Sequence, residues 1–242
     1  MKNYRRLPLN GALNCRDLGG YPAEEGKMTS YHVFYRSDGL YQLTETDWKL
    51  LYEYGVRVIL DLRSASETSH QSYQSAGYGI ETFSVPLQSQ EINLEDLMKR
   101  LKGADEAFIR SMTMDYSDMV RSNPAGIARI LNLAVESLEK GAVLFHCTAG
   151  KDRTGILTAL LFLLCGVPEV DIVADYQVTW TYIKSMIQSM WGDNACIPLM
   201  RSPAENMEQL LVWFKKDQIW KLLEQHGWKK ENAELLKRRF LE

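Results

Sequence analysis

The sequence predicts an α/β fold: a mainly parallel central sheet flanked by helices, with a helical C-terminal region. Two short apolar runs, Val56–Leu60 and Ala142–Phe145, have the length and composition of buried strands. Helical patterns lie next to both runs along the chain. Strands that alternate with helices favour a parallel sheet covered on both faces, because each parallel connection must cross a face of the sheet.

The N-terminal part of the chain predicts a hairpin, a helix and a further strand. Tyr21–Gly26 is a cluster of turn residues, and Lys27–Arg36 after it alternates weakly, which indicates a small antiparallel hairpin. Thr44–Tyr54 predicts a helix, because threonine can cap its start, acidic residues in the first turn suit the helix dipole, and Gly55 follows as a stop. A second strand is predicted over Gly79–Pro86.

The rest of the chain is predicted to be mostly helical. Asn93–Glu139 has a helical pattern that breaks just before Pro124, and this proline is well placed to start the next helix. Arg153–Cys165 predicts an apolar, buried helix. After Pro168 the pattern is helical to the end, and Ser202–Glu205 predicts a capping box with proline in the first helical turn.

Length and composition favour one domain. With 242 residues and 45% hydrophobic residues, the chain suits a single domain over 1–242, with a helical insertion over about 93–122 as a candidate lid. Ile156–Val167, the longest apolar run, is shorter than the roughly 20 residues that a membrane span needs. Met1–Asn10 has no apolar stretch of a secretory signal behind it. No transmembrane segment is therefore expected.

Charge and cysteine usage exclude several classes of protein. A net charge of −3 argues against a nucleic-acid binder that works by neutralising phosphates. The cysteines form no C-x-x-C pair, so zinc fingers and paired redox sites find no support, and they are too scattered for a disulfide scaffold. A reducing cytoplasm is therefore the expected location. The four cysteines are Cys15, Cys147, Cys165 and Cys196.

The segment that indicates chemistry is His146–Gly155, which reads HCTAGKDRTG and lies between a predicted buried strand and a predicted helix. Cys147 is followed six positions later by Arg153, a spacing that is weak by itself. A histidine before the cysteine, Gly150 at the third position after it, and Thr154 after the arginine make the combination specific. A Walker A loop is excluded, since its first glycine and its Ser/Thr are missing.

This spacing has a physical reason. Five residues between the cysteine and the arginine can curl at a helix start, so that their N–H groups converge into an anion nest. Gly150 permits the unusual backbone angles. Thiols at helix N-termini are acidified, so we expect Cys147 to react as a thiolate. Arg153 offers a planar fork to phosphate, and the Thr154 hydroxyl can donate to the cysteine sulfur. The predicted phosphate-binding residues are Thr148, Ala149, Gly150, Lys151 and Thr154.

The segment resembles the signature loop of the cysteine-dependent protein-tyrosine phosphatases. The sequence AGKDRTG is similar to that of bacterial tyrosine/serine phosphatases that also accept phosphoinositides. Cys15 departs from the family pattern, which has an aromatic residue there. Other matching segments are Asn14–Gly20 (NCRDLGG), Tyr35–Ser37, Asp61–Ser64 with Glu67, and Asp175–Tyr176 with Thr179.

The resemblance implies a fold of the cysteine phosphatase type and a mechanism. Cys147 is the implied nucleophile, forming a phosphocysteine, and Arg153 the implied phosphate clamp. Lys151 adds a second positive charge, suited to phosphotyrosine or to polyanionic inositol lipids. The implied partner is a phosphorylated protein, on tyrosine or also on serine/threonine, or a phosphoinositide. No metal or other cofactor is implied, because the nest and the arginine supply the charge stabilisation.

Two aspartates are candidates for the general acid. Asp152 lies inside the loop, and the family resemblance makes it the acid/base. Asp61 ends a predicted strand, where parallel-sheet folds present their sites. We favour Asp152 and keep Asp61 as the second candidate. His146, beside the nucleophile, is expected to order the loop by hydrogen bonding and is not assigned as a base.

Structural roles are expected for several neighbouring residues. We expect local ion pairs between Arg16 and Asp17, and between Arg63 and Glu67 at helical spacing. Tyr176 is expected to pack in the core.

Two other functions stay open. The chain could be a phosphate-binding module without turnover, although Cys147, Asp152, Arg153 and Thr154 are all intact. It could also be an arsenate reductase-like thiol enzyme, which would need a resolving thiol near Cys147; none is near in sequence. The sequence predicts no oligomeric state.

Overall fold

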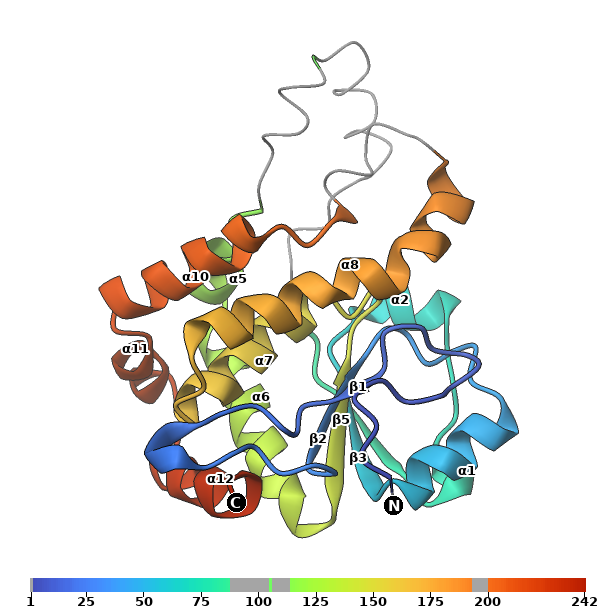
Figure 1. Cartoon of the computed structure of the whole chain (residues 1–242), viewed down its shortest axis with the longest axis horizontal. Helices are drawn as coiled ribbons and strands as arrows, with labels where there is room; N and C mark the ends of the chain where they lie inside the picture. Colours follow the sequence, from blue (N-terminus) through green and yellow to red (C-terminus); the bar gives the residue numbers. More distant parts are fainter. Residues whose placement is uncertain (1, 88–104, 106–113, 193–199) are drawn as a thin grey trace.

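The centre of the protein is a twisted sheet whose strands run in the order β1-β2-β5-β3-β4 (Figure 1). The structure is a computed structural model and describes residues 2–87, 105, 114–192 and 200–242. β2, β5, β3 and β4 are parallel, and β1 pairs antiparallel with β2, which confirms the predicted mainly parallel α/β fold. The strands are β1 (Arg16–Asp17), β2 (Phe34–Ser37), β3 (Val56–Asp61), β4 (Glu81–Ser84) and β5 (Ala142–His146).

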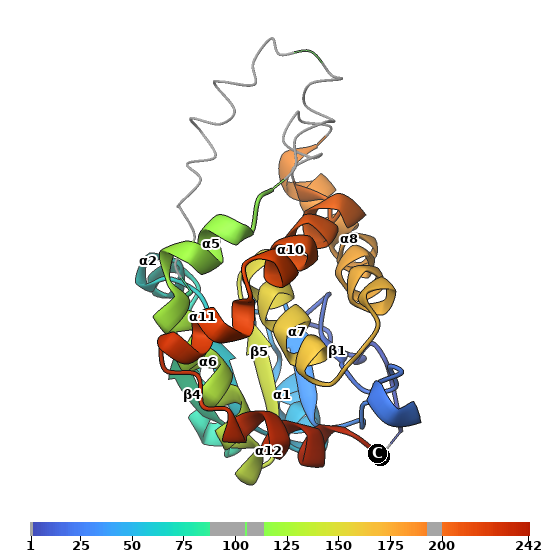
Figure 2. The same cartoon turned by 90° about the vertical axis from the view of Figure 1, so that its left-hand side faces the viewer.

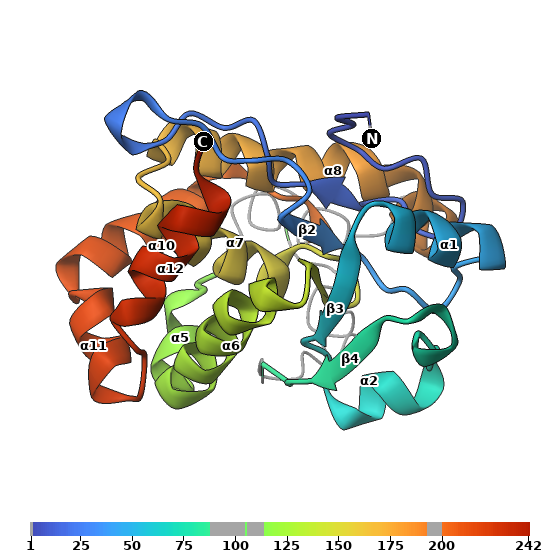
Figure 3. The same ribbon diagram turned by 90° about the horizontal axis from the view of Figure 1, so that it is seen from below.

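Helices cover both faces of the sheet, as Figure 3 shows: α6, α7 and α12 lie on one side, and α1 and α2 on the other. The helices are α1 (Glu45–Glu53), α2 (Ala65–His70), α5 (Ser117–Ser122), α6 (Pro124–Glu136), α7 (Asp152–Leu164), α8 (Glu169–Trp191), α10 (Ala204–Lys216), α11 (Ile219–Gln225) and α12 (Glu231–Phe240). Short 3₁₀ turns are η1 (Glu24–Gly26), η2 (Ala76–Tyr78) and η3 (Ser137–Glu139).

Alternation along the strands divides the apolar side chains between two cores. Leu60 of β3 and Phe145 of β5 belong to the larger core, which α6, α7, α10, α11 and α12 complete. Ile59 and Leu144, one position earlier, belong to the smaller core, to which α1 contributes Trp48. Successive residues of a strand point to opposite faces, so the central strands are apolar throughout.

Helix α7 is buried along most of its length, from Thr154 to Phe162. It contacts both β5 and α8. In the view of Figure 2, β5 is seen between α6 and α7, with α12 below them. A helix that is apolar all round is one that is packed on all sides, which explains the long apolar run of the sequence. Among the described residues, no helix has the length and apolar character needed to cross a membrane.

The carboxyl ends of the parallel strands meet at one edge of the sheet. His146, the last residue of β5, lies between Ser37 of β2 and Asp61 of β3 in the register of the sheet. The loop that follows β5 is therefore flanked by the segments that follow β2 and β3. This edge is where parallel sheets present their sites.

Several element predictions are confirmed or corrected by the structure. The antiparallel N-terminal pairing exists, between β1 and β2. Pro124 begins α6, as predicted. Of the helical stretch Asn93–Glu139 and the candidate lid 93–122, residues 93–104 and 106–113 lie outside the described residues.

The predicted capping box at Ser202–Glu205 is wrong. Helix α10 begins at Ala204 and Pro203 precedes it without a side-chain cap. The Ser202 hydroxyl instead donates to the carbonyl of Gln177 at 2.9 Å and accepts from the Trp180 N–H at 3.0 Å. The sequence pattern predicted that the Ser202 hydroxyl caps α10, but in the structure this hydroxyl bonds to the backbone of α8.

Replacing the cap of α1 should destabilise the fold measurably. The Thr44 hydroxyl accepts from the Asp47 N–H, and the Asp47 carboxylate accepts from the Thr44 N–H. Thr44→Ala should therefore lower the free energy of unfolding by about 1 kcal/mol in urea titrations. The control is Thr46→Ala, an exposed threonine of the same helix, expected to stay within about 0.5 kcal/mol of the wild type. Equal losses for both variants would contradict the capping role.

Candidate active site

The loop between β5 and α7, residues 147–151, holds most of the predicted site residues. Gly150 has φ +66°, and a Cβ there would lie 2.4 Å from the carbonyl oxygen of Ser37. Only glycine meets both constraints, because the backbone angle is left-handed and the end of β2 fills the space. The loop is thus pressed against the end of β2.

The backbone carbonyls of this loop are tied outward. Those of Cys147, Thr148, Ala149 and Gly150 accept hydrogen bonds from His146 Nδ1, Gly39 N, Asn14 Nδ2 and Arg36 Nη2, at 3.1, 3.0, 3.0 and 2.7 Å. In a planar trans peptide the carbonyl and the next N–H point in opposite directions. The N–H groups of residues 148–151 are therefore turned toward the inside of the loop, which is the arrangement of an anion nest.

Cys147 lies at the start of this loop and is buried, with 2% of its surface exposed. Its Sγ accepts a hydrogen bond of 3.2 Å from the hydroxyl of Thr154, in the first turn of α7. The sulfur therefore has a hydrogen-bond donor beside it that can stabilise negative charge.

Arg153 forms a bidentate ion pair with Glu67. The two Nη atoms of the guanidinium donate to the two carboxylate oxygens, each at 2.6 Å. Glu67 also accepts from the Thr148 hydroxyl. Burial disfavours the ionised carboxylate, but the donors around it outweigh burial and hold the pKa of Glu67 well below its usual range. The arginine is thereby fixed beside the loop before it meets any anion.

The predicted ion pair between Arg63 and Glu67 is therefore wrong. α2 begins only at Ala65, so Arg63 precedes the helix and the two residues do not share a helical face. Glu67 is instead the third residue of α2 and forms a capping box with Ser64. The S-x-x-E spacing is a sequence signal that could have marked this carboxylate as a helix-capping group.

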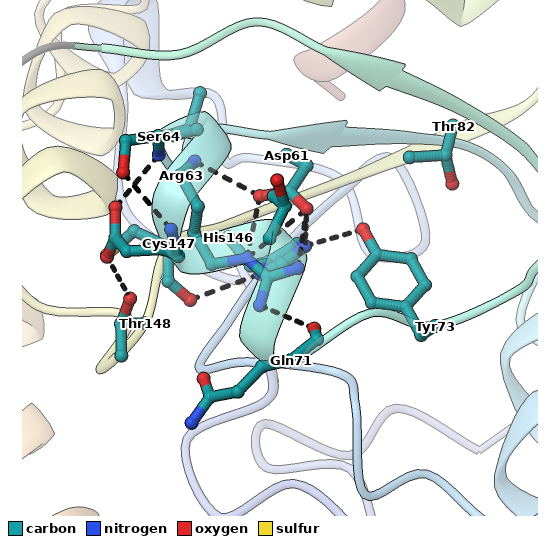
Figure 4. Close-up of polar contacts among 12 residues, drawn as sticks. Asp61, Arg63, Ser64, Gln71, Tyr73, Thr82, His146, Cys147 and Thr148 are labelled. Carbon is teal, nitrogen blue, oxygen red and sulfur yellow. Dashed lines mark hydrogen bonds and ion pairs between the residues drawn. The ribbon is translucent and has the colours of Figure 1, made fainter.

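Arg63 instead pairs with Asp61, as Figure 4 shows. Nε and Nη2 of Arg63 donate to Oδ1 and Oδ2 of Asp61 at 2.9 and 2.7 Å. Burial raises the pKa of Asp61. Arg63 and, to a lesser degree, His146 lower this pKa by more than burial raises it, so the net shift is downward. Asp61 is 4% exposed, and both of its carboxylate oxygens accept hydrogen bonds from Arg63, two residues further along the chain.

His146 links the loop to the segment after α2. Burial lowers the pKa of His146 to about 4, so the ring is neutral near pH 7. Its Nδ1 faces the Cys147 carbonyl and must carry the hydrogen, so Nε2 accepts from the Tyr73 hydroxyl at 2.7 Å (Figure 4). Tyr73 had no role in the sequence prediction, and no local pattern marks it.

Asp152, the first residue of α7, contacts different residues from those that contact Asp61. Its Oδ1 accepts a hydrogen bond of 2.5 Å from the Tyr116 hydroxyl, and its side chain keeps 28% exposure. Lys151 Nζ lies 3.4 Å from the same oxygen and donates to the Arg201 carbonyl at 3.1 Å. The two candidate acids thus differ in both partner and exposure.

Behind the loop lies a fully buried charge cluster. Arg16 and Arg36 both pair with Asp175 of α8, and none of the three is exposed. Burial opposes ionisation of Asp175, but the two guanidiniums outweigh it and hold its pKa well below the usual range. Through the bond from Arg36 to Gly150, this cluster reaches the loop 147–151.

The predicted ion pair between Arg16 and Asp17 is also wrong. The two are consecutive residues of β1, and their side chains leave opposite faces of the strand. Asp17 accepts instead from the backbone N–H groups of Gly19 and His32, at 2.8 and 2.9 Å. Across the described ranges, no group of three or more His, Cys, Asp or Glu side chains is arranged to hold a metal ion.

Comparison with known proteins identifies the family. The model of the "Tyrosine phosphatase family" matches residues 7–242. The chain belongs to the tyrosine phosphatase family. The resemblance found in the sequence is thereby confirmed.

Two relatives and one solved structure show the extent of the similarity. The "Tyrosine-protein phosphatase" of Nostoc commune is 31% identical over 172 residues, covering 67% of this chain and 53% of that protein. The "Triple specificity protein phosphatase PtpB" of Mycobacterium tuberculosis is 30% identical over 194 residues, covering 71% and 67%. The crystal structure of P. aeruginosa TpbA is similar at a TM-score of 0.38 and 13% identity, covering 66% and 83%. The chain thus spans about half the length of the Nostoc protein.

Loss of the Glu67 carboxylate should have a pH-dependent effect on stability. Because the folded pKa is depressed, the stabilisation is present above the usual pKa of a glutamate, about 4.3, and is lost as the pH falls below it. Glu67→Gln should cost on the order of 1 kcal/mol near neutral pH, since the pair is partly exposed.

Urea unfolding between about pH 7 and about pH 3 measures this effect. The difference between wild type and Glu67→Gln should shrink on acidification. Glu53→Gln, an exposed glutamate at the end of α1, is the control and should stay close to the wild type throughout. A difference for Glu67→Gln that is independent of pH would contradict the ion-pair role.

Proposed function

We propose that this protein is a phosphatase that hydrolyses phosphate monoesters through a phosphocysteine on Cys147. The observation that carries the proposal is the loop 147–151 with its carbonyls tied outward, next to a cysteine and an arginine. N–H groups turned inward at the start of α7 suit a dianionic phosphate. No metal or other cofactor is needed, because the nest and Arg153 supply the positive field.

In the first step the thiolate of Cys147 attacks phosphorus, forming the S–P bond as the P–O ester bond breaks. The electron pair of that bond goes to the leaving oxygen, which takes a proton from the general acid. Glu67 occupies the end of the Arg153 guanidinium, so the edge formed by Nε and Nη2 is the one that binds two phosphate oxygens. The loop residues Thr148, Ala149, Gly150 and Lys151 contribute N–H groups.

In the second step water attacks the phosphocysteine. The general acid, now a carboxylate, takes a proton from this water as the new P–O bond forms and the S–P bond breaks. The electron pair returns to sulfur, and the hydroxyl of Thr154, 3.2 Å from Sγ, stabilises the departing thiolate. Inorganic phosphate and the starting enzyme result.

Asp152 is the better candidate for the general acid. It follows the nest directly and keeps 28% of its side chain exposed, so a bound ester can reach it. Asp61 is 4% exposed and both of its carboxylate oxygens are bonded to Arg63, which lowers its pKa and opposes the protonated form that an acid needs. We therefore assign to Asp61 the role of fixing Arg63 at the end of β3, and not that of transferring a proton.

The proposed substrate is phosphotyrosine, with phosphoserine/threonine and phosphoinositides in addition. The name of the Mycobacterium tuberculosis relative, a triple specificity protein phosphatase, supports a broad range. The second cation of the loop, Lys151, supports a highly charged substrate. We propose that residues 1–242 act as one phosphatase domain, which the family match over 7–242 supports, in a reducing cytoplasm where Cys147 remains a thiol.

The alternative functions find less support. An arsenate reductase-like enzyme needs a resolving thiol, and burial raises the pKa of Cys15 and that of Cys165, the latter to about 12. Such buried thiols are poor nucleophiles. Cys196 lies outside the described residues. A binding module without turnover would not need the donor that Thr154 places on the sulfur.

Hydrolysis of p-nitrophenyl phosphate tests the phosphocysteine route. The wild type should turn over this ester with EDTA present at the same rate as without it. Cys147→Ser should fall to the uncatalysed level, because a serine hydroxyl is not ionised near neutral pH. Cys165→Ser, at a buried core cysteine, is the control for thiol loss elsewhere. An inactive wild type, or one that EDTA inactivates, would overturn the proposal.

The identity of the acid is tested with phenyl phosphate, whose leaving oxygen needs a proton. Asp152→Asn should lower kcat/KM by about a hundredfold or more, the usual size of general acid catalysis. Asp61→Asn should lower thermal stability, because it leaves Arg63 buried without its partner. Near wild-type turnover of Asp152→Asn, with loss in a folded Asp61→Asn, would reverse the assignment.

A further inference from the structure

A chain of buried hydroxyls ends on the carboxylate of Asp152. The Tyr116 hydroxyl lies 2.5 Å from Asp152 Oδ1 and 2.6 Å from the Tyr176 hydroxyl. Asn206 Nδ2 lies 3.1 Å from the Tyr176 hydroxyl. Tyr116, Tyr176 and Asn206 are exposed by 1%, 0% and 2%, so water does not compete for these bonds. The chain joins the starts of α5 and α7 to α8 and α10.

The hydrogen bonds of this chain have one direction. Asn206 Oδ1 accepts from the backbone N–H of Met114 at 3.0 Å, which fixes the amide with Nδ2 toward Tyr176. An amide nitrogen only donates, so the Tyr176 oxygen accepts and its own hydrogen is directed to Tyr116. Tyr116 in turn donates to Asp152. Burial, followed by the nearby Asp152 charge, raises the pKa of both phenols, so that they keep their hydrogens.

This direction decides which oxygen of Asp152 carries a proton. The far end of the chain is a donor, so a reversed chain, with Asp152 donating to Tyr116, would leave the buried Tyr176 hydroxyl accepting twice and its own hydrogen without an acceptor among these residues. Oδ1 is therefore an acceptor in both protonation states. Lys151 Nζ lies beside the same oxygen, at 3.4 Å. The hydrogen bond from Tyr116 and the shortest distance to Lys151 thus both fall on Oδ1.

We infer that Tyr116, Tyr176 and Asn206 are positioning residues for the general acid, which hold Oδ1 of Asp152 and leave the transferable proton on Oδ2. The inference rests on the proposed function, in which Asp152 protonates the leaving oxygen. As the P–O ester bond breaks, the proton moves from Oδ2 to that oxygen, and Asp152 becomes a carboxylate whose Oδ1 still accepts from Tyr116. The sequence alone indicated only core packing for Tyr176.

The test compares two esters, p-nitrophenyl phosphate and phenyl phosphate, by kcat/KM. The first has a leaving group that needs little help from an acid, whereas the second depends on it. Tyr116→Phe removes one hydroxyl and keeps the ring. It should lower kcat/KM for phenyl phosphate about tenfold more than for p-nitrophenyl phosphate, a part of the full effect of an acid. Tyr176→Phe should act in the same direction by about threefold.

Asn206→Asp reverses the chain without changing its shape. A carboxylate at this position accepts from Tyr176, which draws the hydroxyl hydrogens away from Asp152. It should therefore reproduce the selective loss on phenyl phosphate, and it serves as the main test if Tyr116→Phe does not fold. Tyr35→Phe is the matched control: this buried tyrosine donates to the Tyr54 carbonyl on the other face of the sheet. Its ratio between the two esters should stay at the wild-type value.

Asp152→Asn separates the two hypotheses. If Asp152→Asn does not selectively impair phenyl phosphate, the assignment of the acid is wrong and this inference fails with it. If Asp152→Asn does so, while folded Tyr116→Phe, Tyr176→Phe and Asn206→Asp lose activity equally on both esters, the proposed function stands and the positioning chain is refuted.

Discussion

The outward attachment of the loop carbonyls is the constraint on which the rest of the site depends. A semicircle of N–H groups has no stability of its own, because each buried carbonyl on its outer side needs a donor. Asn14 and Arg36 supply such donors to Ala149 and Gly150, and each comes from a segment far away in the sequence. The nest therefore depends on the N-terminal segments that carry Asn14 and Arg36, and not on the loop alone.

The buried charges explain why strongly polar residues lie inside the fold. Arg16 and Arg36 share one carboxylate, that of Asp175, so positive charge exceeds negative within this cluster. Burying it is costly unless each group is paired and bonded. The Tyr21 hydroxyl donates to Asp175 and Thr179 accepts from Arg16, while Arg36 Nε has no hydrogen-bond partner among the described residues. The excess positive charge lies behind the loop that we propose to bind phosphate dianions, where we expect it to favour a bound anion.

The sequence could predict the secondary-structure elements and the segment around Cys147, but not which charged side chains pair with one another. The predicted strands, the cap at Thr44 and the start of α6 at Pro124 are local patterns, and the structure has them. The ion pairs predicted for Arg16 and Arg63 were chosen from sequence neighbours and are wrong. Arg16 and Asp17 are consecutive in a strand, so their side chains point to opposite faces. Arg63 and Glu67 do not share a helix, because α2 begins only at Ala65.

By itself the sequence determined the α/β class, the loop from Cys147 to Arg153 and the family, because each follows from residues close together along the chain. Only the tertiary structure decided which groups hold that loop and what surrounds each acid. The sequence favours Asp152 over Asp61 only by resemblance, whereas the structure shows that Asp61 pairs with Arg63 and Asp152 accepts from a donor chain through Tyr116. Such partners are set by the packing of strands and helices, and local spacing carries no information about them.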